Sequence, residues 1–295
     1  MFTTSPKLLA CCLLARCLIS AERYQASEPH MGSVVAITLY AENPDQAQQA
    51  FVAAFKRIAD LNRILSDYDP GSELSRACEG RSASPELIRV VSHAQKLAQE
   101  TGGAFDITVG PLTRLWREAR KAKKMPTDSV IAQARERSGY RKLTVNNGIL
   151  SCAVSGMLLD AGGIAKGYAA DEALAAIRQK GVMSALVAVS GDLAIGDSPP
   201  GKRGWRVKVL NRVRELSNCA VSTSGDEFQF VKLDDVRYSH IIDPRTGTAL
   251  RDSRTVAVIA RSGIDADAIA TAVSVGGSEF IDKLRTAYNA EILLQ

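Results

Sequence analysis

The sequence has no Cys-X-X-Cys pair, and its six cysteines are spread unevenly over 295 residues. Three of them stand in the first 17 residues, and the others occur singly as Cys78, Cys152 and Cys219. Zinc sites and disulfide frameworks show cysteines in close pairs or at regular spacing. The cysteine pattern therefore indicates neither a zinc site nor a disulfide framework.

Aromatic residues are also few, at 5% of the chain, and they do not alternate with its basic residues. Surfaces that bind single-stranded nucleic acid need such alternation, because bases stack on the rings. We therefore expect no nucleic-acid partner, although residues 111–142 hold ten Lys and Arg against three acidic residues. We interpret this segment as one basic helix with a solvated face, and an anionic partner or membrane headgroups are the alternative.

The N-terminus has no hydrophobic run long enough to span a bilayer. Leu8–Leu14 follows Lys7 and ends before Arg16, which resembles the start of an export signal. Leu8-Leu9-Ala10-Cys11 resembles a lipoprotein cleavage box; a truncated signal or a misplaced start codon would look the same. We expect residues 1–25 to be a signal or lipoprotein segment and 26–295 the functional domain. The protein would then be exported to the periplasm, or anchored on that side of the inner membrane by an N-terminal lipid.

Hydrophobic spacing predicts a series of helices and strands along the rest of the chain. Two helix starts are marked by an N-cap residue before proline, Asn43-Pro44 and Ser84-Pro85. Besides the basic segment, helices are predicted over 44–65, 85–100, 164–180 and 265–275. Strands are predicted over 30–40, 142–145, 184–189, 205–210, 219–224 and 255–260. With 46% hydrophobic and 23% charged residues, the composition is that of a globular protein.

The chain is organised around Leu158–Asp171, which reads L-L-D-A-G-G-I-A-K-G-Y-A-A-D. Gly162 and Gly163 keep Cβ atoms out of the turn that opens the helix over 164–180. Backbone N–H groups at such a helix start can approach a phosphate closely, and Lys166 would add positive charge there. Asp160 suits a hydroxyl-rich group or a cation better than a phosphate. An ordinary strand–turn–helix corner is the alternative interpretation.

Two loops carry aromatic residues suited to a ligand. Tyr68 lies in the polar loop at 66–73, where its ring could stack on a planar ligand or simply stand at the surface. The run Ala104-Phe105-Asp106 follows a glycine pair, so an acidic residue stands beside an aromatic one in a loop. Either feature alone is a weak signal.

His240 is one of three histidines and stands close to Asp243 and Arg245 in sequence. An imidazole among polar residues is a suitable proton acceptor, and a histidine that only hydrogen-bonds its own loop is the alternative. Asp267 and Thr271 are four residues apart, hence on one helical face. Their oxygens suit Mg²⁺, which takes few protein ligands plus phosphate and water, and a simple acidic residue at a helix start is the alternative.

Taken in order, eight segments resemble the FAD:protein FMN transferases, the ApbE family formerly called thiamine-biosynthesis lipoproteins. The segments are M-G-S, S-D-Y-D-P-G-S-E-L-S-R, T-G-G-A-F-D-I-T-V-G-P-L, L-D-A-G-G-I-A-K-G-Y-A, S-G-D, T-S-G-D, H-I-I-D-P-R-T-G and D-A-D-A-I-A-T-A. They run from about Met31 to the C-terminus. Each is weak alone, but the full set in the family's order is specific.

The resemblance implies an enzyme that takes FAD as substrate and Mg²⁺ as cofactor. It would move FMN onto a threonine or serine hydroxyl of an acceptor flavoprotein, for example a subunit of a membrane redox complex, and release AMP. It also implies an α+β fold, with helices on a mainly antiparallel sheet and an FAD cleft between two lobes. The irregular alternation of predicted helices and strands agrees with that fold.

The resemblance also assigns roles to particular positions. His240 would be the catalytic base. The residues that would contact FAD are Met31, Tyr68, Ala104, Phe105, Asp106, Asp160, Lys166 and Ile241. The metal would be held by Gly163, Asp267, Ala270 and Thr271, the glycine and the alanine through their carbonyl oxygens.

Three positions depart from the family pattern: Ser33, Ala161 and Ser190 replace a threonine, a bulkier apolar residue and the first glycine of G-G-D. None of these changes removes a charge or a metal-binding oxygen. Two other functions stay open at this level. Water in place of the acceptor hydroxyl would make the protein an FAD pyrophosphatase that forms FMN and AMP, and the same site without catalysis would make it a flavin-binding protein.

Overall fold

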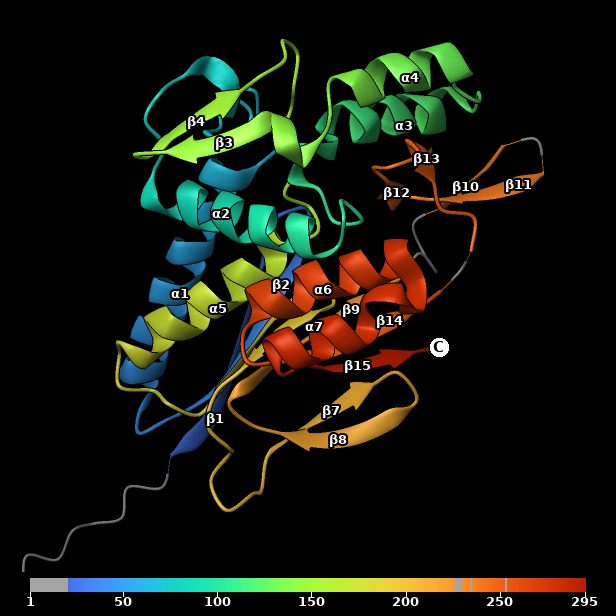
Figure 1. The fold of residues 1–295 in the computed structure, drawn as a ribbon. Coiled ribbons are helices and arrows are strands. Elements are labelled where there is room, and N and C mark those ends of the chain that lie inside the picture. The colour runs from blue at the N-terminus through green and yellow to red at the C-terminus, as the bar shows by residue number, and fades with distance from the viewer. Residues whose placement is uncertain (1–20, 226–229, 234, 253) are drawn as a thin grey trace, which may run out of the picture.

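The computed structural model describes residues 21–225, 230–233, 235–252 and 254–295. At its centre is an antiparallel sheet with the strand order β1-β2-β5-β6-β9-β14-β15 (Figure 1). Its strands are β1 (Glu22–His30), β2 (Ser33–Ala41), β5 (Ala185–Val189), β6 (Asp192–Ile195), β9 (Cys219–Ser224), β14 (Val256–Ala260) and β15 (Glu291–Leu294). The predicted α+β fold with a mainly antiparallel sheet is confirmed.

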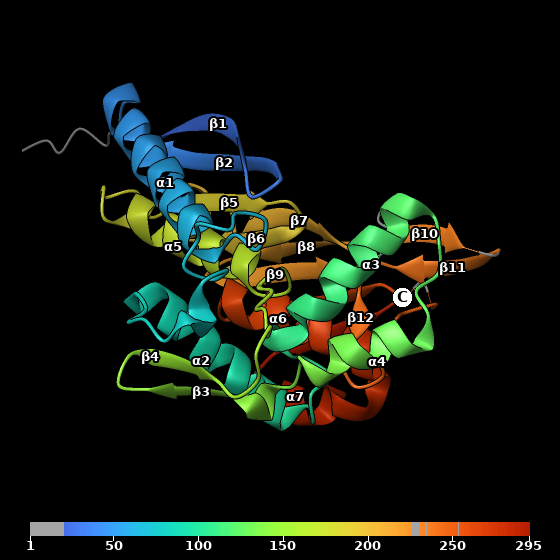
Figure 2. The same ribbon diagram turned by 90° about the horizontal axis from the view of Figure 1, so that it is seen from above.

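The two faces of this sheet are covered differently. Helices α1 (Pro44–Leu65), α5 (Ala165–Arg178) and α6 (Gly263–Gly276) pack on one face (Figures 1 and 2). The hairpin of β7 (Trp205–Val209) and β8 (Arg212–Leu216) packs on the other. Alternation along β14 explains this, because Val256 and Val258 face the helices while Ala257 faces the hairpin.

Both predicted helix starts are present and capped. The Asn43 side chain accepts a hydrogen bond from the Gln46 backbone N–H at 2.9 Å, and Ser84 caps α2 (Pro85–Glu100) in the same way through the Leu87 N–H. The strand predicted over 30–40 is present as β2, which begins at Ser33 after a tight turn at Met31 and Gly32. Strand β1, which precedes that turn, was not predicted.

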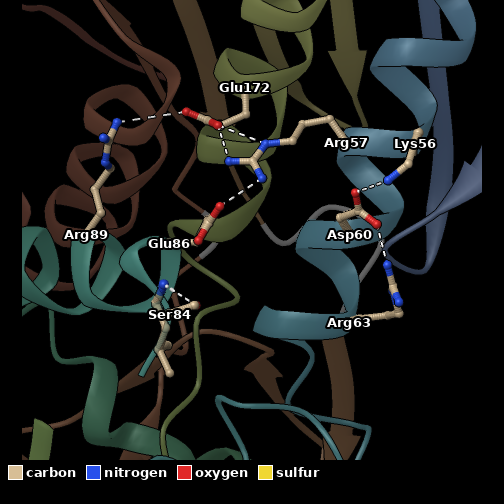
Figure 3. A network of polar contacts seen from close by, with 9 residues as sticks. Lys56, Arg57, Asp60, Arg63, Ser84, Glu86, Arg89 and Glu172 are labelled. Carbon is tan, nitrogen blue, oxygen red and sulfur yellow. Dashed lines mark hydrogen bonds and ion pairs between the residues drawn. The ribbon is translucent and has the colours of Figure 1, made fainter. Parts of the chain in front are cut away.

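One guanidinium joins three helices outside the sheet. Arg57 of α1 donates to Glu172 of α5 at 2.9 Å and to Glu86 of α2 at 3.0 Å, and Arg89 of α2 lies 3.9 Å from Glu172 (Figure 3). These contacts fix α2 against the layer of helices. The hairpin of β3 (Leu143–Asn146) and β4 (Ile149–Cys152) packs next to α2.

The basic segment forms two helices, α3 (Gly110–Ala122) and α4 (Asp128–Glu136), so the prediction of one basic helix was wrong. Helix α3 ends because Lys123 takes a left-handed conformation, with φ of 49°, and Pro126 follows. The two helices pack on β10 (Phe230–Leu233), β11 (Val236–Ser239), β12 (Ile242–Asp243) and β13 (Thr248–Ala249) around a small core of their own. We call this unit the basic lobe.

The remaining elements are short. Helix α7 (Ile281–Tyr288) precedes β15, and single 3₁₀ turns span η1 (Ala77–Glu79), η2 (Ile107–Val109), η3 (Tyr140–Lys142) and η4 (Gly277–Phe280). Within the described ranges, no helix combines the length and the apolar character needed to cross a bilayer.

Strand β1 overlaps the segment expected to be a signal. It pairs with β2 along its whole length, from Glu22 opposite Ala41 to His30 opposite Ser33. The expected domain boundary at residue 26 thus falls inside this strand, and residues 22–25 belong to the sheet. The export features at Lys7–Leu14, including the cleavage box at Cys11, lie outside the described residues.

Cys78 and Cys152 form a disulfide between η1 and β4, with their Cα atoms 5.3 Å apart. The prediction of no disulfide framework was therefore wrong for this pair. Sequence spacing could not reveal it, because the two cysteines are 74 residues apart and meet only when the chain between them folds back. Cys219 is a free thiol.

The disulfide should contribute substantially to stability. Replacing both Cys78 and Cys152 by serine is expected to lower the free energy of unfolding by about 4 kcal/mol, because a closed loop of this length restricts the unfolded chain. Urea unfolding in oxidising buffer measures the change, and Cys219→Ser is the matched control with little expected effect. Equal midpoints for the double variant and the parent would contradict a stabilising bridge.

Candidate functional site

Two glycines bring α5 and α6 into direct backbone contact. A Cβ atom added to Gly167 would lie 2.0 Å from the Gly263 carbonyl oxygen, and one added to Gly263 would lie 2.3 Å from the Gly167 oxygen. Glycine is therefore the residue that this crossing requires. The close approach lets the backbone N–H of Gly167 donate to Asp267 Oδ2 at 3.0 Å, so a carboxylate from α6 meets the first turn of α5.

The residues predicted to hold a metal gather at this crossing. A Cβ atom on Gly163 would lie 2.7 Å from Thr271 Oγ1, so Gly163 is packed directly against the hydroxyl of Thr271. Asp267 precedes Thr271 by one turn of α6. The Ala270 carbonyl is less suitable, because it already accepts a hydrogen bond from Ser274 Oγ at 2.9 Å.

Asp192 joins this group from the sheet, at the first residue of β6. Its Oδ2 atom lies 3.6 Å from Lys166 Nζ, and its Oδ1 atom accepts from Ser222 Oγ at 2.5 Å. Asp192 and Asp267 are only 4% and 5% exposed. Sequence analysis did not select Asp192, although the S-G-D segment contains it.

The group formed by Lys166, Asp192 and Asp267 holds more negative than positive charge. Burial and, to a smaller extent, the nearby Asp192 carboxylate together raise the pKa of Asp267 to about 8. Burial also raises the pKa of Asp192. Burial lowers the pKa of Lys166, but the Asp267 and Asp192 carboxylates outweigh it and raise that pKa overall. The Lys166 ammonium thus interacts with two buried carboxylates.

These residues fit a divalent cation with hard-oxygen preference. Carboxylate, hydroxyl and carbonyl oxygens are the ligands that Mg²⁺ takes, and a second positive charge would offset the excess carboxylate. In the part of the chain that the structure describes, no group of three or more His, Cys, Asp or Glu side chains is arranged to hold a metal. A site with few protein ligands leaves positions for phosphate and water, as Mg²⁺ prefers.

A second charged group lies around Asp160. The backbone N–H of Asp160 donates to the Ile107 carbonyl at 2.8 Å. The side chain of Asp160 accepts a hydrogen bond from the Gly162 N–H at its Oδ1 atom, also at 2.8 Å. Its Oδ2 atom accepts from Arg117 of α3 at 3.2 Å. Arg117 also donates to Asp67, so one buried and one partly buried carboxylate share one guanidinium. The segment before Gly162, at 153–160, forms no strand.

Tyr68 stands beside this group with an exposed ring. The Arg117 guanidinium lies 4.2 Å from the centre of the ring, while 76% of Tyr68 is open to solvent. Sequence analysis selected Tyr68 and Asp160 but not Arg117, which it counted only as part of the basic segment. It also passed over Asp67, the neighbour of Tyr68.

Ala104, Phe105 and Asp106 point inward. Phe105 belongs to the main core, and Ala104 is buried. Both oxygens of Asp106 are used, since Oδ1 accepts from the N–H and the hydroxyl of Thr108 and Oδ2 accepts from the Tyr140 N–H at 2.7 Å. Burial raises the pKa of Asp106 against the effect of these bonds. The side chains of this run shape the loop, and its backbone is what can meet a ligand.

Met31 occupies the turn between β1 and β2 in a left-handed conformation, with φ of 50°. A bulky residue in that region costs free energy, and such strain is concentrated at functional sites. Met31 packs against the two hydrophobic cores that lie between the sheet and its helices. It also borders an open hollow of about 550 Å³ that Asn62 lines as well. The structure thus places Met31 at a surface opening.

His240 and Ile241 lie between β11 and β12 in the basic lobe, and both are half-buried. The Ile241 N–H donates to Ser239 Oγ at 3.1 Å, and its carbonyl accepts from the Leu250 N–H at 2.9 Å. Asp243 is paired with Arg245 through two bonds of 2.9 Å. The T-S-G-D segment ends at Asp226, which lies outside the described residues.

Comparisons with known proteins agree with one another. The profile of the ApbE family matches residues 31–294. The FAD:protein FMN transferase of Vibrio cholerae is 31% identical over 286 residues, covering 90% of this chain and 85% of that protein. The FAD:protein FMN transferase of Escherichia coli K12 is 30% identical, covering 74% of this chain and 68% of that protein.

Solved structures of the same kind match the fold. The flavin transferase ApbE from Vibrio cholerae has a TM-score of 0.80 at 29% identity, covering 93% of each chain. The flavinyl transferase ApbE of Pseudomonas stutzeri, in its apo form, has a TM-score of 0.83 at 27% identity, covering 94% of this chain and 92% of that one.

The glycine crossing should be intolerant of any side chain. Gly167→Ala is expected to lower the free energy of unfolding by about 3 kcal/mol, because the new methyl group overlaps the Gly263 carbonyl and forces the helices apart. Gly71→Ala is the control, since its Cβ would meet only the side chain of Asp69, at 3.2 Å. Thermal unfolding measures both variants, and equal melting temperatures would show that the crossing is not tightly packed.

Proposed function

We propose that this chain, which belongs to the ApbE family and is a flavin transferase, moves the FMN half of FAD onto a threonine or serine hydroxyl of an acceptor flavoprotein and releases AMP. The observation that carries the proposal is the buried group at the crossing of α5 and α6. There Lys166, Asp192, Asp267 and Thr271 meet beside the glycine turn at 162–163.

The start of α5 suits the pyrophosphate of FAD. The helix begins at Ala165, and Ile164 separates it from the glycine pair. The N–H groups of Gly162 and Gly167 already donate to Asp160 and Asp267, so Lys166 is the group of this turn that we expect to meet the anion. Lys166 is held charged by the two carboxylates near it. A lysine held at this point can neutralise charge that develops on a phosphate oxygen.

We propose Mg²⁺ as the cofactor of the reaction. Asp267 and Thr271 would hold it together with the carbonyl oxygen of Gly163, a residue whose Cα is packed against Thr271. When bound, the ion would polarise the phosphoryl group that is transferred and offset the charge on the leaving phosphate. Asp192 would hold Lys166 in place, since its own Oδ1 atom is fixed by Ser222.

We assign to His240 the role of the base that accepts the proton of the acceptor hydroxyl. The acceptor hydroxyl oxygen would form a bond to the phosphorus of the FMN half while the bond from that phosphorus to the AMP oxygen breaks. The hydroxyl proton must leave during this step, and an imidazole is suited to accept it near neutral pH. His240 and Ile241 would reach the site from the basic lobe, and FAD would contact Met31, Tyr68, Asp160 and the backbone at 104–106 from the other elements.

We also propose that the protein is exported and works in an oxidising compartment. An N-terminal lipid would anchor it there if the box that ends at Cys11 is processed as a lipoprotein signal. The Cys78–Cys152 disulfide supports export, because such bridges persist in oxidising environments and are rare in the cytosol. An acceptor subunit of a membrane redox complex would meet the enzyme there.

The transfer can be tested by intact-mass analysis of a threonine-bearing acceptor flavoprotein after incubation with the protein, FAD and Mg²⁺, with AMP measured in parallel. We expect covalent FMN on the acceptor and one AMP for each FMN attached. His240→Ala should reduce transfer about 100-fold or more while FAD binding changes little. AMP with an unmodified acceptor would instead indicate a pyrophosphatase, and FAD that stays bound without either product would indicate a flavin carrier.

The metal assignment predicts a shared defect in two variants. Asp267→Asn and Thr271→Val should each lower kcat by about 100-fold and raise the Mg²⁺ concentration needed for half-maximal rate, because the first removes a negative charge from the ion's ligands and the second removes a hydroxyl oxygen. Asp265→Asn, on the same helix but paired with His93 at 3.1 Å, is the control. Unchanged Mg²⁺ dependence in both variants would remove the assignment.

A further inference from the structure

Arg117 makes contacts with three residues that come from two other segments of the chain. Its Nη1 atom donates to Asp67 Oδ2, and its Nη2 atom donates to Asp160 Oδ2 at 3.2 Å. The plane of the same guanidinium lies under the Tyr68 ring, 4.2 Å from its centre. One side chain on α3 thus joins the loop of Tyr68 to the segment that ends in Asp160.

We propose that Arg117 is a positioning residue of the flavin site, which holds the Tyr68 ring and the Asp160 carboxylate in the arrangement that receives FAD. The inference rests on the proposed function, since Tyr68 and Asp160 are the residues assigned there to FAD. It adds to that assignment a residue from the basic segment and a specific role for it.

The exposed ring needs such support. Tyr68 stands on a polar surface loop with 76% of its surface in solvent, so packing against the core does not fix its orientation. Arg117 covers one face of the ring, and the other face stays open to a planar ring of the ligand. A guanidinium stacks on an aromatic face and remains charged at any physiological pH. A ring held in place before binding loses less freedom when the ligand stacks on it.

The carboxylates of Asp67 and Asp160 both depend on the positive charge of Arg117. Burial raises the pKa of Asp67, the Asp160 carboxylate adds to the rise, and Arg117 opposes both effects. The planar fork of a guanidinium can donate to two carboxylates at once while its face stacks on a ring, which the single point charge of lysine cannot do. Lysine is therefore not expected to replace Arg117.

Arg117 is itself held in place by its neighbour on α3. The Trp116 ring lies 5.3 Å from that of Tyr238, and its Nε1 atom donates to the Gly247 carbonyl at 2.9 Å. Helix α3 is therefore anchored to the strands around His240 on one side and reaches Asp160 on the other. Arg117 thus acts from a rigid element, as a positioning residue should.

The test compares Arg117→Lys and Arg117→Ala with Lys121→Met, which removes an exposed cation of the same helix that is paired with Glu118 at 3.4 Å. FAD affinity is measured by quenching of flavin fluorescence, and kcat and KM by AMP release. We expect both Arg117 variants to raise the Kd and KM for FAD about tenfold or more, with kcat changed less than about threefold. Guanidinium ion at a non-denaturing concentration should partly restore FAD affinity to Arg117→Ala, and Lys121→Met should behave as the parent protein.

The outcomes separate this inference from the proposed function. Parent-like FAD affinity in both Arg117 variants, or full activity of Arg117→Lys, would overturn the positioning role. A fall in kcat and melting temperature at unchanged KM would overturn it as well, because a merely structural role has that signature. If the parent protein binds FAD but releases no AMP, the transferase proposal fails, while weaker FAD binding by Arg117→Ala would still support the role of Arg117.

Discussion

The contact between Gly167 and Gly263 sets the distance between α5 and α6, and the candidate site depends on that distance. With any side chain at either position, the helices would separate and the Asp267 carboxylate would lose the Gly167 N–H. Lys166 would then face one carboxylate fewer, and Gly163 would move away from Thr271. The packing of two glycines is therefore what concentrates charge and oxygen ligands in one buried place, where electrostatic interactions are strong.

A second constraint comes from α3, which has different partners on its two sides. Trp116 packs into the small core of the basic lobe, and Arg117 reaches the carboxylates of Asp67 and Asp160. The lobe that carries His240 is thus tied to the segment that carries Asp160 through adjacent residues of one helix. The Cys78–Cys152 disulfide ties η1, which follows the Tyr68 loop, to β4, which precedes the Asp160 segment.

Much of the fold could be predicted from local pattern. The caps Asn43 and Ser84, the β-branched residues of β2 and the apolar spacing of α1 all depend on residues close together in sequence, so the sequence displays them directly. Asp267 and Thr271, the side chains predicted to bind a metal, were likewise selected from a single helical spacing, and they lie where Gly163 approaches α6. The site residues that were passed over, Asp192 and Arg117, carry no local sign of their partners.

The sequence by itself therefore determined many of the helices and strands, the order of the motifs and the family, because propensity, capping and periodicity are short-range effects. Only the tertiary structure decided which carboxylates share a cation, that Cys78 meets Cys152, and that the side chains of Phe105 and Asp106 turn inward. Such pairings join residues many positions apart in the sequence, and burial then shifts the pKa of their ionisable groups. The distance between two such residues follows from how helices pack on the sheet, which no single stretch of sequence encodes.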